Sequence, residues 1–176
     1  MTDKVGSKNR EREAAVPTHP ALRVRYERNK FAEQQMTGKV VIRDSDREWR
    51  TTEQSPKVKW YLQPHTFTDH ALRDWYVFSH DVQKQSGKHK HQGGGVSIFV
   101  LKGKGYTIVE GKRYDWEEGD LILLPHKPGG VEHQHFNLEP EKECKWIAFI
   151  YLPYHNMLAS VTTQIERFPE YKPEVT

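Results

Sequence analysis

Two pairs of histidines, each with a single residue between them, bracket the middle of this chain and limit its fold more than any other feature. His89 and His91 form the first pair, and His133 and His135 form the second. Between the pairs lie short runs rich in β-branched and aromatic residues, such as Val96 to Leu101, and turns that contain glycine separate these runs. They have no helical period, so they predict consecutive antiparallel strands.

The spacing of the first pair indicates a metal site. In a strand, side chains two residues apart point to the same face, so His89 and His91 would present both imidazoles on one side. If the strands belong to one small barrel, His133 would reach the same interior. Imidazole ligands suit iron, zinc, copper and nickel, and three protein ligands with open positions are typical of a catalytic metal. A structural zinc site would usually add cysteine, and the chain has only Cys144.

The second histidine pair lies in a motif that resembles the second motif of the cupin superfamily. This motif has a glycine, five residues, a proline, and then glycine, two residues, histidine, three residues and asparagine. It is met at Gly119, Pro125, Gly130, His133 and Asn137, with two extra residues between the proline and the second glycine. The resemblance implies an all-β, single-domain cupin β-barrel, a jelly-roll-like double-stranded β-helix with short flanking helices.

The first cupin motif is met less completely. His89, His91 and the later Gly103 match it, but Gly87 lies too close to His89, and Gly95 or Val96 stands where the family has a metal-binding glutamate. Together the two motifs cover roughly a third of the chain and are fairly specific as a pair.

The missing glutamate makes the chain similar to the three-histidine iron cupins of the gentisate dioxygenase type. By this resemblance His89, His91 and His133 would be the metal ligands, and His135 and Gln92 would contact the substrate or orient the site. The expected metal is Fe(II), and Zn, Ni or Mn are alternatives. The expected partners are dioxygen and a hydroxylated aromatic or enolisable small molecule. Three neutral ligands leave the ion its full charge, which favours an anionic, chelating substrate.

Other interpretations of the same residues remain open. Ten histidines in 176 residues make some close pairs unsurprising, so the first pair could be ordinary surface histidines. The chain could be a cupin that binds a metal or ligand without turnover, because a fold does not fix a function. It could also be a zinc or nickel cupin that acts as an isomerase or lyase.

The flanking segments divide the chain into three parts. Residues 1–37 form a charged N-terminal extension, in which a helix is expected to begin at Pro20 after Thr18 as its cap and to end at Gly38. Residues 38–153 form the predicted barrel, and residues 154–176 form a C-terminal segment. In that last segment Met157, Val161 and Ile165 recur at fourfold spacing, which predicts a helix across residues 154–168.

Four further strands are expected in the barrel, over residues 40–42, 58–62, 74–80 and 145–152. The last of these is apolar over residues 146–152, which predicts burial on both of its faces.

Composition excludes several other classes of protein. The formal net charge is only +3, and basic residues alternate with acidic ones, which argues against a nucleic-acid partner. The longest apolar run, residues 146–152, is too short to cross a bilayer, and no signal-peptide core follows Met1. A single cysteine excludes an internal disulfide, so we expect a cytoplasmic protein. The flanking segments favour a homodimer.

Overall fold

The computed structural model describes residues 16–92 and 95–173, and most of the regular structure in these ranges is β-strand. The strands are β1 (Arg50–Thr52), β2 (Ser55–Leu62), β3 (Trp75–Asp81), β4 (Lys88–Gln92), β5 (Val96–Lys102), β6 (Lys104–Val109), β7 (Lys112–Glu117), β8 (Leu121–Leu124), β9 (Val131–Asn137), β10 (Lys145–Tyr151) and β11 (Val161–Glu166). The helices are α2 (Pro20–Thr37) and α3 (Leu152–Met157), with a 3₁₀ turn, η1, at Asp44–Asp46.

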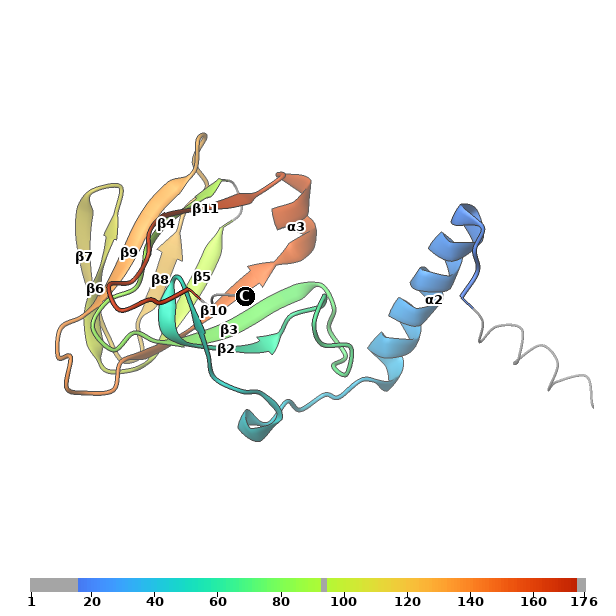
Figure 1. The fold of residues 1–176 in the computed structure, drawn as a ribbon, viewed down its shortest axis with the longest axis horizontal. Coiled ribbons are helices and arrows are strands. Elements are labelled where there is room, and N and C mark those ends of the chain that lie inside the picture. Colours follow the sequence, from blue (N-terminus) through green and yellow to red (C-terminus); the bar gives the residue numbers. More distant parts are fainter. Residues whose placement is uncertain (1–15, 93–94, 174–176) are drawn as a thin grey trace, which may run out of the picture.

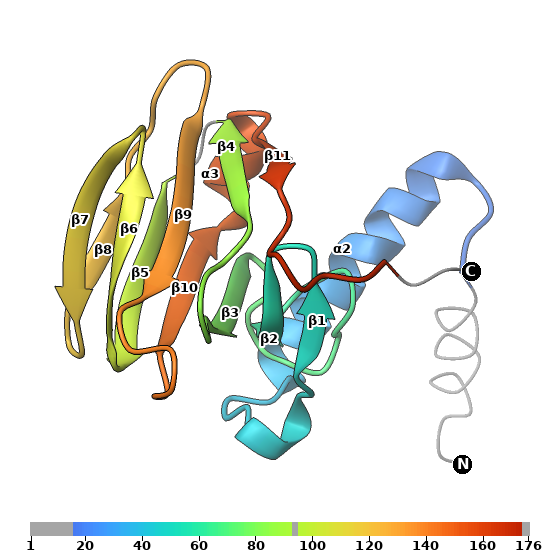
Figure 2. The same ribbon diagram turned by 60° about the vertical axis from the view of Figure 1, so that its left-hand side comes forward.

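The strands form two antiparallel sheets that face each other (Figures 1 and 2). One sheet has six strands in the order β1-β2-β3-β10-β5-β8, and the other has five in the order β11-β4-β9-β6-β7. The all-β barrel expected from the sequence is confirmed. Because β4 and β9 are neighbours in the second sheet, the two histidine pairs lie side by side although about forty residues separate them.

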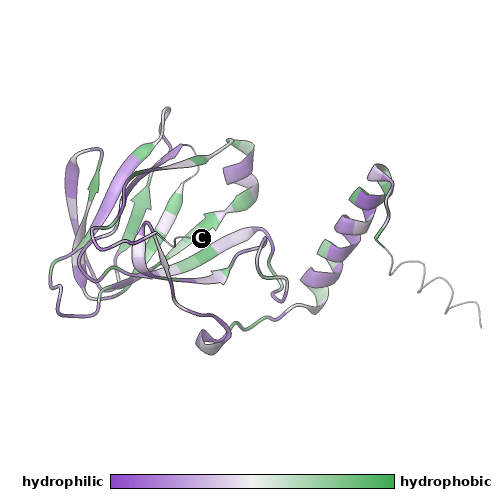
Figure 3. Ribbon diagram, in the orientation of Figure 1, coloured by the Kyte–Doolittle hydropathy of each residue, from purple (hydrophilic) through white to green (hydrophobic). Residues whose placement is uncertain are grey.

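The core lies between the sheets, where alternate residues of the central strands meet. Val96, Ile98 and Val100 of β5 are buried, as are Trp146 and Ala148 of β10, while the residues between them are half-buried or exposed. This alternation follows from the period of a strand, which turns successive side chains to opposite faces. The expectation that β10 is buried on both faces was therefore wrong, because no layer of the described residues covers its outer face at Phe149 and Tyr151. Figure 3 shows the apolar residues concentrated in these central strands.

Three of the further strands expected from the sequence are present as β2, β3 and β10, but residues 40–42 do not form a strand. Val40 is 91% exposed, and only Lys39 makes an isolated bridge, to His70. A strand needs a neighbour to pair its backbone groups, and within residues 16–92 and 95–173 this segment, which connects α2 to the barrel, has none. The strand predicted from this short apolar run was therefore wrong.

The predicted N-terminal helix is present as α2, but the cap is different. His19 precedes the helix without a side-chain cap, in place of the expected Thr18, and the amide of Gly38 donates to the carbonyl of Gln34 (2.7 Å) at the end. Gln34 is the only buried residue of α2, and the helix stands to one side of the sheets in Figure 1. The charged residues 1–13 lie outside the described part of the chain. Among the described residues, no helix is both long and apolar enough to span a membrane.

The helix predicted over residues 154–168 was wrong for most of its length. Helix α3 ends at Met157, and Val161–Glu166 forms β11, which pairs with β4. The fourfold spacing of apolar residues was outweighed by the β-branched run Val161-Thr-Thr and by the open edge of β4. The barrel sheet therefore continues past residue 153, the boundary expected from the sequence.

Candidate metal centre

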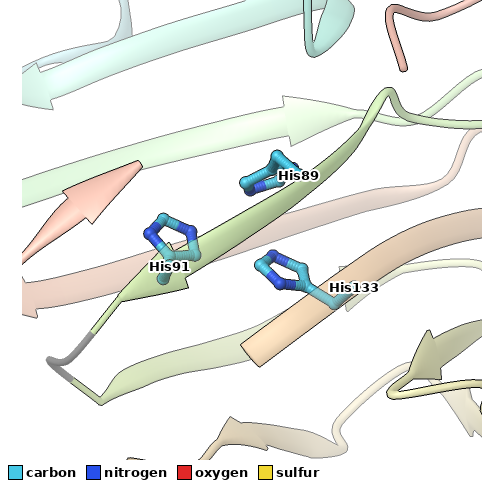
Figure 4. A group of neighbouring side chains, drawn as sticks. All are labelled: His89, His91 and His133. Carbon is cyan, nitrogen blue, oxygen red and sulfur yellow. The ribbon is translucent and has the colours of Figure 1, made fainter. Parts of the chain in front are cut away.

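Three histidines converge on one point at the inner face of the five-stranded sheet. His89 and His91 come from β4, and His133 comes from β9, directly opposite His89 in the strand register. The ring centroids are 4.2 Å apart for His89 and His133, 4.9 Å for His89 and His91, and 5.1 Å for His91 and His133. Figure 4 shows the three rings turned toward a common space between the two strands.

The glycine before β9 allows the two strands to lie this close. Gly130 has a φ of 92°, which L side chains rarely adopt, and a Cβ at this position would lie 2.6 Å from the carbonyl oxygen of His91. Only glycine fits such a position without moving the backbone. At the far end of β9, the Asn137 side chain donates to the carbonyls of Gln83 (2.7 Å) and Lys142 (3.0 Å) and ties two loops together. Both residues of the motif thus have structural roles that hold the site in place.

Each of the three rings has an oxygen next to its Nδ1 atom. His89 Nδ1 lies 3.4 Å from the carbonyl oxygen of Gly87, and His133 Nδ1 lies 3.3 Å from that of Val131. A carbonyl only accepts, so these two rings carry their proton on Nδ1 and keep a free lone pair on Nε2. His91 Nδ1 lies 3.2 Å from the hydroxyl of Thr162 on β11. The two carbonyls thus leave Nε2 of His89 and His133 available as a ligand, and the Thr162 hydroxyl, which can donate or accept, is the neighbour of the third ring.

Burial keeps these imidazoles neutral. It lowers the pKa of His89 to about 4 and that of His91 to about 3, and it also holds the pKa of His133 well below its usual value, with nearby His89 adding to the effect. A group that is hard to protonate at neutral pH presents its lone pair instead, which is the form that binds metal.

The residues present fit a metal ion. The ligand atoms of His89, His91 and His133 all lie within 4.8 Å of one another. Bonds from imidazole nitrogen to a metal are about 2.0–2.1 Å long, so modest ring rotations would bring the three atoms to one ion. Three neutral nitrogens supply an incomplete coordination shell, which leaves positions for other ligands.

His135 lies behind this group and has partners of its own. Its Nδ1 atom is 2.8 Å from the hydroxyl of Thr107, which in turn accepts a hydrogen bond from the indole of Trp116 (2.8 Å). The His135 ring is fully buried, and its centroid lies 5.4 Å from that of His133. The chain of hydrogen bonds fixes the orientation of His135 next to the three-histidine group. His135 therefore lies next to His133, and its expected role as a residue that contacts the substrate or orients the site stays a prediction.

The structure does not bring Gln92 to the group. Gln92 is exposed at the end of β4, and it shares strand parity with Lys88 and Lys90, so it faces away from the imidazoles of His89 and His91.

Sequence reasoning missed several residues around the site. Thr162 contacts His91 from a strand that was expected to be a helix, and the β-branched run around it was the signal available. His155 on α3 lies close enough to contribute to the lowered pKa of His91. His80 was not missed in the same way, because the strand predicted over residues 74–80 allows it to face the pocket; it stacks on Trp146, with ring centroids 4.2 Å apart, and burial holds its pKa well below the usual value.

The match to a known family agrees with this geometry. Residues 77–150 match the family model described as a cupin domain. Together with the two antiparallel sheets, this match defines the class: the protein has the cupin fold, with a cupin domain over these residues.

Solved structures with the same fold include two kinds of enzyme. Salicylate 1,2-dioxygenase from Pseudoaminobacter salicylatoxidans, with gentisate, is 14% identical with a TM-score of 0.50; the match covers 80% of this chain but only 35% of the dioxygenase chain. The chain thus spans about a third of the length of that relative. A variant of Streptomyces PAC13 with uridine is 12% identical with a TM-score of 0.52, over 75% of this chain and 95% of PAC13.

A further structure of Pac13 describes it as a nucleoside dehydratase, with 11% identity and a TM-score of 0.52. At such identities the similarity establishes the fold and not the reaction. No curated protein sequence matches the chain.

Proposed function

We propose that this chain is a metal-dependent enzyme, a non-haem Fe(II) dioxygenase that cleaves a hydroxylated aromatic or enolisable substrate. The observation that carries the proposal is the group of three neutral imidazoles, His89, His91 and His133, each of which offers one nitrogen within 4.8 Å of the other two. The fold shared with salicylate 1,2-dioxygenase supports it. Zinc, nickel and manganese would also accept this ligand set.

The ligand set decides what kind of substrate the site would attract. No aspartate, glutamate or cysteine belongs to the group, so among the described residues no ligand charge offsets that of a divalent ion. An anionic substrate with two adjacent oxygens would therefore bind well at the open positions. An Fe(II) ion here would supply the redox chemistry that joins such a substrate to dioxygen.

The rest of the interior would orient the substrate and exclude water. Ile98 and Ala148 line the buried face of the opposite sheet, which makes the interior apolar. His135 is held by Thr107, so its second ring nitrogen has a fixed direction from which to hydrogen-bond a substrate oxygen. The half-buried His91 marks the end of the group that is nearest to solvent.

Metal analysis tests the first part of the proposal. Protein purified without chelators is expected to hold about one divalent ion per chain, and His89→Ala and His133→Ala are expected to lose it. His65→Ala is a matched control, because His65 is exposed in a loop and lies outside the group. Metal retained in both ligand variants would show that the ion binds elsewhere.

Oxygen consumption tests the reaction. The chain loaded with ferrous iron is expected to take up dioxygen with at least one member of a panel of catechols, gentisate, salicylates and diketones, and His133→Ala is expected to take up none. If the protein is saturated with iron but takes up no dioxygen with any compound of the panel, the result would instead support a cupin that binds metal or ligand without turnover.

A second candidate function is a zinc or nickel lyase or isomerase. The similarity to PAC13 favours this candidate. The match covers 95% of the PAC13 chain and 75% of this one, so the two chains are similar in length. Conversion of a substrate under anaerobic conditions, supported by zinc but not by iron, would select this candidate over the dioxygenase.

We also propose that two copies of the chain associate. The outer face of the six-stranded sheet exposes Phe99, Leu121, Leu123 and Phe149. The register places Phe99 opposite Leu121, so these side chains form one apolar surface. Burying it in a second copy would remove apolar area from water. Light scattering is expected to give the mass of a dimer, and Leu123→Lys is expected to give that of a monomer.

The cytoplasmic location stays a prediction, which cell fractionation would test.

A further inference from the structure

The three imidazoles are not oriented in the same way. For His89 and His133, the oxygen beside Nδ1 is a carbonyl two residues earlier on the same strand, so each strand orients its own ring. For His91 the oxygen is the hydroxyl of Thr162, on β11. This strand lies outside residues 77–150, the part of the chain that matches the cupin model.

The register of β11 makes the contact specific. Thr162 is paired with His91 and Gln164 with His89 along the antiparallel ladder. The Gln164 side chain donates to the carbonyl of Lys88 (3.1 Å), which holds β11 against the beginning of β4, and also to the carbonyl of Glu166 (2.7 Å) on its own strand. A slip of one residue would turn Thr162 to the other face and remove the hydroxyl from His91.

We propose that Thr162 is a positioning residue for the metal site: its hydroxyl accepts a hydrogen bond from Nδ1 of His91 and so holds the Nε2 lone pair toward His89 and His133. This proposal rests on the metal-binding function proposed above. It makes the affinity for the ion dependent on a strand outside the cupin domain.

The tautomer of His91 is the physical reason. A neutral imidazole can carry its proton on either nitrogen, and the hydrogen bond at one nitrogen selects which nitrogen is left to bind metal. An acceptor beside Nδ1 selects the form with a free Nε2. His91 is only half-buried, whereas His89 and His133 are buried, so its ring is the least enclosed of the three. It is therefore the ligand that depends most on a side-chain partner.

Three substitutions on β11 separate this role from a general effect on the strand. Thr162→Val keeps the shape and the β-branching but removes the acceptor. Thr162→Ser restores the hydroxyl. Thr163→Val makes the same change at the next residue, which is exposed and paired with Lys90 on the opposite face of the strand.

Zinc titration by calorimetry is expected to show about tenfold weaker binding for Thr162→Val, the lower end of the usual range for partners of metal-bound histidines. Thr162→Ser and Thr163→Val are expected to bind zinc as the unchanged chain does. In the metal-free protein, ¹⁵N chemical shifts of the His91 ring are expected to report protonated Nδ1, and Thr162→Val is expected to mix the two tautomers.

Two results would overturn the proposal, and they can be told apart. If the unchanged chain and Thr162→Val bind zinc equally, with the same His91 tautomer, then Thr162 does not position the ligand although the metal site stands. If the unchanged chain binds no divalent ion at all, then the proposed function fails and this inference fails with it.

Discussion

At the residue scale, the interior of this barrel holds an unusual concentration of neutral histidines. Besides the three grouped imidazoles, His80 and His135 are fully buried, and burial lowers the pKa of His135 to about 3. Within the described part of the chain, His80 Nδ1 and Trp146 Nε1 have no hydrogen-bond partner. These two nitrogens are removed from water without a hydrogen bond in return, which lowers the free energy of unfolding. Such a loss is typical of residues kept for binding rather than for stability.

The lowered pKa of His80 predicts a loss of stability in acid. Above about pH 6.5 His80 is neutral in both the folded and the unfolded chain. Below it, the unfolded chain takes up a proton that the folded chain cannot, so the free energy of unfolding falls as the pH falls. His80→Phe preserves the stack on Trp146 and removes the titration.

Urea denaturation at pH 7 and pH 5 measures this effect. The stability of His80→Phe relative to the unchanged chain is expected to rise between pH 7 and pH 5. An identical difference at the two pH values would show that His80 has the same pKa in the folded and the unfolded chain, as an exposed histidine has.

Replacing Gly105 by a larger residue is expected to destabilise the fold by overpacking. A Cβ at this position would lie 2.2 Å from the carbonyl oxygen of Phe136 and 2.3 Å from the buried ring of Trp116. Gly105→Ala is therefore expected to lower the free energy of unfolding by about 1–3 kcal/mol, as measured by chemical denaturation. In the control Gly95→Ala, the nearest atom is Nε2 of the exposed His126 ring at 3.2 Å, and moving this ring would cost at most the exposed hydrogen bond that it accepts from the Gly95 amide (2.8 Å). Equal losses in the two variants would contradict this explanation.

How much of the site could be predicted depends on how far apart in the sequence the interacting residues lie. The parity of His89 and His91 is local, so the period of a strand was enough to predict that both rings share a face. Grouping them with His133 required the pairing of β4 with β9, and the cupin motifs supplied it. The acceptors beside Nδ1 are backbone carbonyls and a hydroxyl 71 residues away from His91. No pattern of residue types marks them.

At the element scale, the errors fall on segments where local pattern and tertiary pairing disagree. Val161 and Ile165 fit a helical stripe, but β4 would otherwise expose an unpaired edge, and β11 satisfies it. Residues 40–42 fit a strand, but they have no neighbour. The central strand β5 was predicted well, because its local pattern and its burial agree, whereas β10 was predicted in place but not in burial.

The weak packing of α2 leads to a prediction for the element as a whole. The helix is anchored by a hydrogen bond from the buried Gln34 side chain to the carbonyl of His70 (2.7 Å), and the Arg73 guanidinium lies over the Phe31 ring. A chain that begins at Gly38 is expected to keep the barrel folded, with a free energy of unfolding about 1–2 kcal/mol lower, on the scale of one hydrogen bond and one cation–π contact.

Gln34→Ala in the full chain is the matched comparison, and it is expected to show most of this loss. Circular dichroism and chemical denaturation measure both variants. An unfolded truncated chain would mean that α2 is part of the core, contrary to its exposure.

At the scale of the whole molecule, the barrel is held by pairings between segments that lie far apart in the chain. Strand β3 pairs with β10, and β4 pairs with both β9 and β11, so neither sheet can form from one local stretch. The three histidines lie at one of these long-range junctions. A metal ion there would join β4 to β9, and its binding energy would add to the stability of the entire fold.

Metal loading is therefore expected to raise the melting temperature of the protein. An ion that binds only the folded chain stabilises it by about 2.7 kcal/mol when its free concentration is 100 times Kd. For a chain of this size that corresponds to an increase of about 5–10 °C. Calorimetry with added zinc measures the shift, and a chelator is expected to reverse it. His133→Ala, which removes the ligand that β9 contributes, is expected to melt at the same temperature with and without zinc. If the unchanged chain showed no shift at saturating zinc, then the ion would not bind the folded barrel in preference to the unfolded chain, and the three imidazoles would have to be explained as a buried cluster without a ligand.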